Sequence, residues 1–217
     1  GLVSYKYLFD ELEKNIEHKK VLHVGCVGSW DKDSTNNFGM HKYLMEHVKE
    51  LHGIDIDGDG INKMKEDGYK NVFIDNNELD DKYDVIAPLS VLHFVPNPIE
   101  FLSYYKDKLN DNGAIVAEVG NAYSFSNIYR TIFKFNLAKP TTNIGQSEIG
   151  EVFIFSSSTV IKLFNASGFN DVKVVPVYRK KVAKGNIKEQ IRISINNLMG
   201  YIIRGFSPTI FIVAKVN

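Results

Sequence analysis

The stretch Val21-Leu22-His23-Val24-Gly25-Cys26-Val27-Gly28-Ser29 decides the fold of this 217-residue chain. Its first four residues predict a buried strand. The two glycines that follow, separated by two residues, predict a turn in which the backbone can approach a ligand closely. A second apolar run, residues 51–56, predicts a neighbouring parallel strand with Asp55 at its end, where a carboxylate accepts a pair of ribose hydroxyls. Together the two runs indicate a site for an adenosine-type cofactor.

Short apolar strands alternate with amphipathic helices over most of the chain. Further strands are expected at residues 72–75, 85–89, 114–119, 172–178 and 210–216. Apolar residues at helical spacing predict helices over residues 5–16, 38–49, 61–67, 99–109, 159–166 and 187–202. Ser156 has the chemistry of a helix cap, and Gly68 and Gly168 are typical of helix ends. The alternation predicts a doubly wound α/β fold with helices on both faces of a parallel sheet.

The length fits one domain, residues 1–217, with additions to its core. Residues 1–20 supply an N-terminal helix. Residues 120–155, where the alternation stops, predict an insertion or lid on the substrate side. Residues 179–207 predict a basic helical insertion before the last strand.

Charge is divided unevenly along the chain, although its formal net charge is zero. Residues 179–217 hold eight Lys or Arg and one Glu, a balance of +7, and the remainder carries −7. Such a basic lobe indicates either a solvated face or an anionic partner, which would be a phosphorylated substrate, a membrane surface or RNA.

Cysteine and histidine usage speaks against disulfide and metal chemistry. The single Cys26 excludes an internal disulfide and fits a reducing cytoplasm. The histidines have no carboxylate cluster at ligand spacing, so no metal is predicted. The run Asp55-Ile56-Asp57-Gly58-Asp59-Gly60 looks like a calcium loop, but a strand rather than a helix precedes it. Residues 1–20 are charged and amphipathic, unlike a secretion signal, which favours a cytoplasmic protein or one held peripherally at the inner membrane face.

In the order of its features the chain resembles the class I S-adenosylmethionine-dependent methyltransferases. The resemblance spans residues 19–217 and rests on the glycine turn, the acids after the second and third strands, Tyr83-Asp84-Val85-Ile86, residues 91–98 and residues 109–118. It implies a Rossmann-like sheet of seven strands, mostly parallel, with the last strand antiparallel. It also implies S-adenosylmethionine as the cofactor.

The resemblance implies a set of cofactor contacts. The glycine turn would pass beneath the methionine part, Asp55 would accept both ribose hydroxyls, and Asp75 would meet the adenine amino group with Asn76 close by. The cofactor-binding residues so implied are His23, Gly25, Cys26, Gly28, Asp55, Ile56, Asp75, Asn76 and Leu89. The chain departs from the family where His23 replaces an acid, where Val27 replaces a glycine, and where His93-Phe94 replaces an acid and a histidine.

The region after the fifth strand is similar to methyltransferases encoded with bacterial surface-polysaccharide genes, which implies a sugar, sugar nucleotide or lipid-linked glycan methylated on oxygen. A sugar hydroxyl has low acidity and needs a general base, for which His93 is the first candidate and Glu118 the second. The residues expected to frame the acceptor are Tyr123, Tyr129, Arg130, Glu148 and Glu151, the glutamates being further candidates for the base.

Two other functions fit the same fold. The basic lobe favours an RNA methyltransferase, although the Asn or Asp with a proline-aromatic signature of such enzymes is replaced by Ala87-Pro88-Leu89-Ser90. The departures at His23, Val27 and His93 would also fit a non-catalytic binding module. The sequence does not indicate an oligomeric state.

Overall fold

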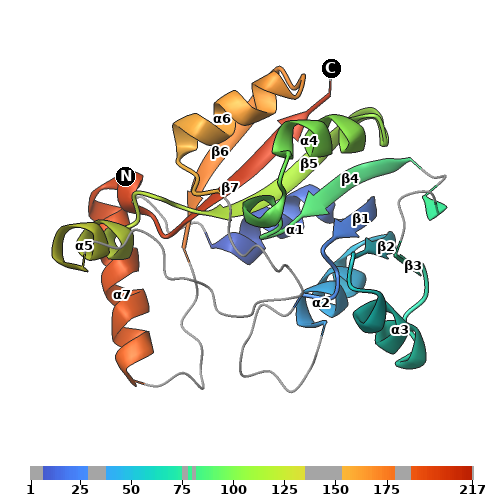
Figure 1. Ribbon diagram of the computed structural model, residues 1–217, viewed down its shortest axis with the longest axis horizontal. Helices are drawn as coiled ribbons and strands as arrows, with labels where there is room; N and C mark the ends of the chain where they lie inside the picture. Colours follow the sequence, from blue (N-terminus) through green and yellow to red (C-terminus); the bar gives the residue numbers. More distant parts are fainter. Residues whose placement is uncertain are drawn as a thin grey trace.

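Seven strands form one sheet in the part of the chain that the structure describes (Figure 1). The structure is a computed structural model that describes residues 7–28, 38–74, 78–79, 82–134, 153–178 and 187–216. The strand order is β3-β2-β1-β4-β5-β7-β6. The last strand, β7, runs antiparallel to both of its neighbours, and the other pairs are parallel. The predicted mostly parallel, seven-stranded fold is therefore confirmed.

The strands at the centre of the sheet are buried on both faces. β1 pairs in parallel with β2 on one side and with β4 on the other. Val21 and Leu22 point to opposite faces, yet neither is exposed to solvent. Burial on both faces explains why this stretch is almost continuously apolar. The strands are β1 Lys20–Val24, β2 Glu50–Ile54, β3 Val72–Phe73, β4 Tyr83–Pro88, β5 Leu109–Gly120, β6 Asp171–Val177 and β7 Thr209–Lys215.

Helices cover both faces of the sheet (Figure 1). Leu102 of α4 and Phe164 of α6 pack in one apolar core, and Leu12 of α1 and Leu44 of α2 pack in the core on the opposite face. A helix is present in each of the six regions where helical spacing predicted one, and α5 is a further helix within residues 120–155. The helices are α1 Leu8–Ile16, α2 Gly39–His47, α3 Gly58–Glu66, α4 Pro98–Lys106, α5 Phe125–Lys134, α6 Ser157–Ala166 and α7 Ile187–Ile202, with short 3-10 helices η2 Leu92–Phe94 and η3 Arg204–Phe206.

The predicted cap residues occupy the ends of their helices. Ser156 accepts a hydrogen bond from the Thr159 backbone N–H, and the Thr159 hydroxyl accepts one from Ser156, which forms a capping box at the start of α6. Gly68 after α3 has a φ of +90°, and Gly168 after α6 has a φ of +86°. This left-handed conformation, which favours glycine, turns the chain out of each helix.

The largest difference from the predicted bounds lies between α4 and β5. The helix expected over residues 99–109 ends at Lys106, and Leu109 already belongs to β5, where it pairs with Tyr83. Residues 110–113, which precede the strand predicted at 114–119, form an irregularity inside β5, because the next pair along joins Val85 to Ala114. The side-chain amide of Asn110 donates to the Asp84 carboxylate at 2.8 Å and ties this irregular segment to β4.

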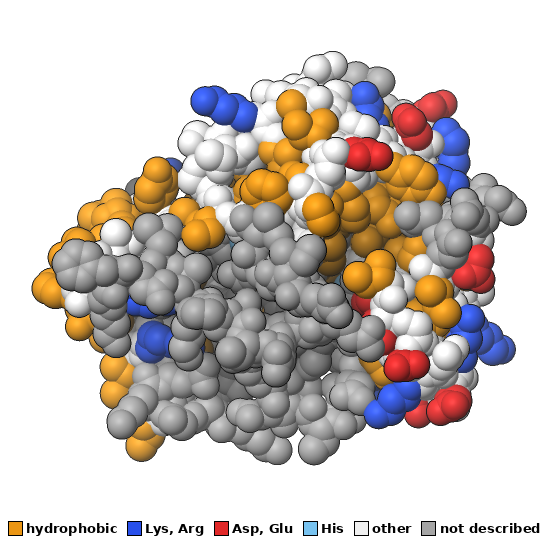
Figure 2. Space-filling view, viewed as in Figure 1, with side chains coloured by type: hydrophobic (Ala, Val, Ile, Leu, Met, Phe, Trp, Pro, Cys, Tyr) orange, Lys and Arg blue, Asp and Glu red, His pale blue; other side chains and the backbone are white. Residues whose placement is uncertain are grey.

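Helices α5 and α7 lie together beyond the end of the sheet (Figure 1). The apolar periodicity that predicted α7 marks an exposed face, whose aliphatic side chains are 44–76% exposed. Figure 2 shows hydrophobic side chains gathered at the edge of the molecule where these helices lie. Within the described ranges no helix is both long and apolar enough to cross a membrane. The exposed residues of α7 are Ile187, Ile191, Ile195, Leu198 and Ile202.

Two histidines are buried together between the sheet and α2. His23 of β1 and His41 of α2 are 1% and 2% exposed, and their Nδ1 atoms lie 3.3 Å apart. One ring must donate and the other accept, so the accepting imidazole must be neutral, and the contact cannot form between two protonated rings. Burial lowers the pKa of His23 well below its usual value, and it lowers the pKa of His41 to about 4.

Acidification should therefore destabilise the fold before carboxylates titrate. Below about pH 6.5 these two histidines bind protons in the unfolded chain but stay unprotonated in the folded one. The free energy of unfolding should therefore fall by up to about 1.4 kcal/mol per pH unit for each histidine. Urea unfolding between about pH 7.5 and about pH 5 measures this slope. His41→Gln should make the slope shallower, while His47→Gln, outside the buried pair, should change it less. Equal slopes for wild type and both variants would contradict this account.

Candidate functional site

The glycine turn after β1 joins three strand ends. The backbone N–H groups of Gly25 and Cys26 both donate to the carbonyl of Ile54 at the end of β2, at 2.8 and 3.2 Å. Gly25 has a φ of +80°, and a Cβ atom there would lie 2.5 Å from Cγ2 of Val91, which follows β4. Conformation and contact both require glycine at this position.

The second glycine of the turn has a different role. Gly28 is exposed, and among the described residues a Cβ atom added to it would meet the carbonyl oxygen of Gly25 alone, at an ordinary contact distance of 3.5 Å. Packing against the described residues therefore does not require glycine here. Gly28 follows the carboxyl end of β1, and ligands bind outside the carboxyl ends of the strands in sheets of this kind.

Asp55 fastens the glycine turn to the end of β2. One carboxylate oxygen accepts from the Val27 backbone N–H at 2.9 Å, and the other accepts from the Asp57 N–H at 3.0 Å. Burial raises the pKa of Asp55, and these backbone N–H groups act in the opposite direction. A carboxylate offers about four acceptor positions, more than these backbone N–H groups occupy, so it can also accept from a hydroxyl donor. Ile56, the next residue, is 84% exposed.

The side chains of the turn itself are packing residues in this structure. Cys26 is buried, its sulfur lies 3.8 Å from that of Met64, and burial raises the pKa of its thiol. Val27, which stands where a glycine was expected, packs against Gly60, where an added Cβ atom would lie 2.2 Å from Val27 Cγ1. Gly60 thus makes room for the valine.

The segment after β4 carries Leu89 and Ser90 toward the end of β5. Leu89 is buried and pairs with Glu118 of β5. Ser90 has a φ of +57°, and its hydroxyl donates to the Glu118 carboxylate. Glu118 is only 1% exposed, so the hydroxyl bond helps to hold a buried acidic side chain at the carboxyl end of the sheet.

Both ring nitrogens of His93 are engaged by backbone groups. Nδ1 lies 3.0 Å from the carbonyl oxygen of Phe153, which can only accept, so Nδ1 carries the proton. Nε2 accepts from the backbone N–H of Gly120 at 3.0 Å. The imidazole therefore joins η2 to β5 and to the chain before α6. For His93 to serve as a general base, the bond to Gly120 would have to break.

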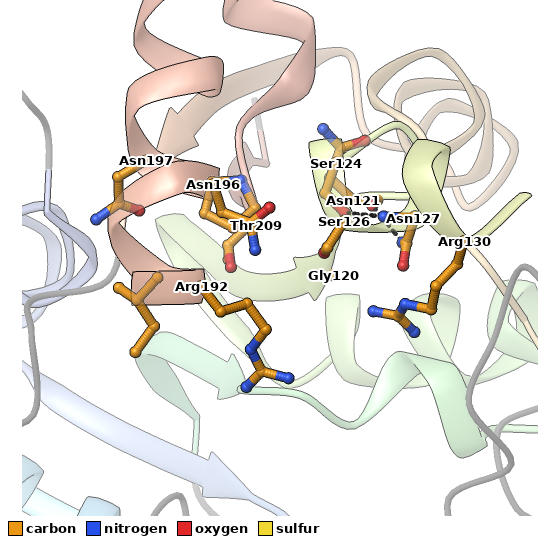
Figure 3. A pocket seen from close by; sticks show the side chains of 12 residues that line it. Gly120, Asn121, Ser124, Ser126, Asn127, Arg130, Arg192, Asn196, Asn197 and Thr209 are labelled. Carbon is orange, nitrogen blue, oxygen red and sulfur yellow. Dashed lines mark hydrogen bonds between the residues drawn. The ribbon is translucent and has the colours of Figure 1, made fainter. Parts of the chain in front are cut away.

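A pocket of about 230 Å³ opens between α5 and α7, beside the carboxyl end of β5 (Figure 3). Arg130, expected to frame the acceptor, lines it, whereas Tyr123 and Tyr129 do not and are 60% and 47% exposed. Sequence reasoning missed the contributions of α7, for which the basic lobe and its helical periodicity were the available signals. The lining residues are Gly120, Asn121, Ser124, Ser126, Asn127, Arg130, Arg192, Ile193, Asn196, Asn197, Pro208 and Thr209.

Asn121 holds the two sides of this pocket together. Its side-chain amide donates to the carbonyls of Gly205 and Ser207, each at 2.8 Å, on the stretch between α7 and β7. Its side-chain oxygen accepts from the Tyr123 N–H, and its own carbonyl accepts from the Asn127 side chain at the start of α5. A single buried amide therefore connects the ends of α5 and α7 to the sheet.

Four of the expected site residues lie outside the described residues: Asp75, Asn76, Glu148 and Glu151. The predicted lid lies partly there as well, since residues 135–152 are not described. Among the residues that are described, no three His, Cys, Asp or Glu side chains are grouped in a way that could hold a metal ion.

Known proteins share this arrangement. A family profile described as "Methyltransferase domain" matches residues 5–174, and no curated protein matches the chain. The fold is similar to a SAM-dependent methyltransferase from Archaeoglobus fulgidus, at 21% identity and a TM-score of 0.62 over 96% of this chain and 91% of that one. It is also similar to an S-adenosylmethionine-dependent methyltransferase from Mesorhizobium loti, at 12% identity and a TM-score of 0.58 over 95% and 97% of the two chains. These identities show a shared fold, and the profile, which covers well over half of the chain, shows the family: this protein belongs to the methyltransferase domain family.

Proposed function

We propose that the protein transfers a methyl group from S-adenosylmethionine to an oxygen atom of a saccharide or other small molecule. The acceptor would be a sugar, a sugar nucleotide or a lipid-linked glycan. The observation that carries the proposal is the half-buried Asp55 carboxylate beside the glycine turn, at the crevice between β1 and β4. The Methyltransferase domain match over residues 5–174 supports the same reaction class.

The residues around the turn fit the cofactor. Asp55 retains acceptor capacity for ribose hydroxyls, and the exposed backbone at Gly28 leaves room for the methionine part. Ile56 follows Asp55 and is exposed, Leu89 follows β4 and is buried, and His23 and Cys26 are buried in the core. When bound, S-adenosylmethionine supplies a methyl group activated by a positively charged sulfur.

The chain's task toward the acceptor is to place its oxygen in line with that methyl group and to exclude water. The segment after β4 suits this task because Val91 contacts the glycine turn and His93 binds the end of β5. Its hydrogen bonds favour His93 as a positioning residue rather than as the base. Glu118 and the two glutamates outside the described residues stay candidates for proton acceptance from a sugar hydroxyl.

The part of the basic lobe that the structure describes fits a small acceptor better than RNA. Sequence-independent RNA binding needs a groove of cations along the phosphate backbone. The described part of α7 instead exposes aliphatic side chains, and the arginines Arg130 and Arg192 converge on a pocket of about 230 Å³. That volume accommodates one chemical group of an acceptor.

The direct test is calorimetry of the full chain with S-adenosylmethionine and with its demethylated product. Micromolar binding of either ligand is expected, and absence of binding to both would sink the proposal. Transfer of labelled methyl from S-adenosylmethionine to a panel of sugar phosphates, sugar nucleotides and RNA would then identify the acceptor class. Label found in RNA alone would overturn the saccharide assignment.

The two glycines should respond differently to alanine. Gly25→Ala introduces a left-handed alanine, at about 1–2 kcal/mol, and overlap with Val91, at about 1–3 kcal/mol, so it should lower the free energy of unfolding by at least about 2 kcal/mol. Gly28→Ala should leave stability nearly unchanged and weaken S-adenosylmethionine binding. Urea unfolding and calorimetry separate the two effects. If Gly28→Ala bound the cofactor as tightly as wild type does, the backbone at Gly28 would have no role in the cofactor site.

Removing the charge of Asp55 should weaken cofactor binding. Asp55→Asn exchanges one acceptor oxygen for a donor, and hydrogen bonds to charged groups contribute about 1.5–3 kcal/mol, so affinity should fall roughly tenfold or more. Asp59→Asn, an exposed acid in the first turn of α3, is the matched control and should bind normally. Both variants are compared by calorimetry after thermal unfolding has confirmed that they fold. Equal affinities in the two variants would rule out the role of Asp55.

The protonation of His93 can be read directly. The contacts to Phe153 and Gly120 require a neutral ring with its proton on Nδ1. Nitrogen-15 NMR of the histidine side chains near neutral pH should show this tautomer for His93, with His93→Gln used to assign the signal. A ring protonated on Nε2 instead would free the histidine from Gly120 and restore its candidacy as the base.

A further inference from the structure

We propose that the pocket between α5 and α7 binds a phosphate or pyrophosphate group carried by the acceptor. The inference rests on the proposed function, since it gives a chemical class to the molecule that receives the methyl group. It is carried by the pocket's charge, by one buried polar atom that has no hydrogen-bond partner among the described residues, and by the pocket's position relative to the glycine turn.

The pocket is positively charged. Arg130 of α5 and Arg192 of α7 line it, and none of its described lining residues is acidic. Figure 3 shows the two side chains on opposite sides of the pocket, one from each helix. A guanidinium presents five donors in a planar fork that matches phosphate oxygens. Two forks from separate helices suit a group with several negatively charged oxygens.

The inner wall offers hydrogen-bonding groups to the rest of the ligand. Ser124, Ser126 and Asn127 come from the start of α5, and Thr209 comes from the start of β7. The side-chain oxygen of Asn196 is buried and has no hydrogen-bond partner among the described residues. An unsatisfied buried acceptor is unfavourable, so this oxygen calls for a donor such as a hydroxyl group. A phosphorylated sugar carries both the anion and the hydroxyls.

The size of the pocket limits what enters it. Its volume of about 230 Å³ is below the roughly 300–1,000 Å³ of sites that enclose a whole drug-sized ligand. A phosphate with part of the group that it carries would fit. The remainder of the acceptor would then extend outside the pocket, toward the reacting methyl group.

The pocket and the glycine turn are joined by direct contacts. Gly120 lines the pocket and donates its N–H to His93, while Val91, two residues before that histidine, contacts Gly25. The segment after β4 therefore lies between the two sites. An acceptor held by its phosphate in the pocket would reach the turn along this segment.

Calorimetry of the full chain with inorganic pyrophosphate and with glucose 1-phosphate tests the site. Wild type should bind both probes, and added salt should weaken the binding. Arg130→Gln and Arg192→Gln should each weaken it roughly tenfold or more. Arg204→Gln, an exposed arginine outside the pocket, is the matched control and should bind as wild type does. Thermal unfolding of all three variants verifies that they fold.

A second arm separates a soluble phosphate from one on a lipid. Vesicles of phosphatidylcholine, with and without phosphatidylglycerol, are sedimented with each variant. Retention on the anionic vesicles that needs both pocket arginines, without binding of glucose 1-phosphate, would support the anion site and identify a lipid-borne phosphate. Equal behaviour of the pocket variants and Arg204→Gln in both arms, or no binding in either arm, would overturn the proposal.

Binding of S-adenosylmethionine, measured in the same variants, keeps the two claims apart. The pocket variants should bind the cofactor as wild type does, because Arg130 and Arg192 belong to α5 and α7 and not to the glycine turn. Cofactor binding without arginine-dependent binding of either probe would refute the anion site and leave the methyltransferase assignment standing. If the chain bound a probe through these arginines but did not bind the cofactor, the anion site would stand and the methyltransferase assignment would be refuted.

Discussion

The contact between Gly25 and Val91 is the constraint on which the cofactor end of this protein depends. Only a residue without a Cβ atom lets the chain leaving β1 turn at a φ of +80° beneath the segment leaving β4. The same turn donates two backbone hydrogen bonds to the end of β2, and Asp55 closes the arrangement by accepting from Val27. The carboxyl ends of β1, β2 and β4 are thereby held together, and the candidate cofactor site lies at these ends.

The opposite end of the site depends on polar contacts instead. Asn121 and His93 each use a neutral side chain to join backbone groups that are distant in sequence. The buried amide of Asn121 and the half-buried imidazole of His93 stabilise the fold because their donors and acceptors are matched. The helices α5 and α7 are therefore fastened to the sheet through a few directional bonds, while the central strands are held by apolar packing.

The features that the sequence predicted are those with local causes. A glycine in a left-handed turn, a serine that caps a helix and an acid at a strand end act through neighbouring residues, so Gly25, Ser156 and Asp55 were recognisable. The end of α4 was misplaced because residues 110–113 have turn chemistry in either setting, and only pairing with β4 decides that they belong to a strand. The sequence also did not predict that the apolar face of α7 is exposed. Periodicity identifies an apolar face of a helix, but it does not show whether another part of the protein covers that face.

The candidate site was harder to predict than the fold because its contacts join distant parts of the chain. His93 binds Phe153 and Gly120, which are 60 and 27 residues away, and nothing near His93 in sequence indicates these partners. Arg192 lines the same pocket as Arg130 only because α7, which follows β6 in the chain, packs beside α5. The basic lobe indicated an anionic partner, but the place where its charge would converge required the tertiary structure.

The way in which Asn121 fastens the outer helices has a consequence for how this fold can acquire new specificities. Its amide binds main-chain carbonyls of residues 205 and 207, and those bonds do not depend on which side chains face the pocket. The side chains of α5 and α7 that face the pocket can therefore be substituted one at a time while the backbone of these helices keeps its position. The pocket walls, which evolution or an engineer can vary, are thereby separate from the glycine turn, which must bind the same methyl donor whatever the acceptor is.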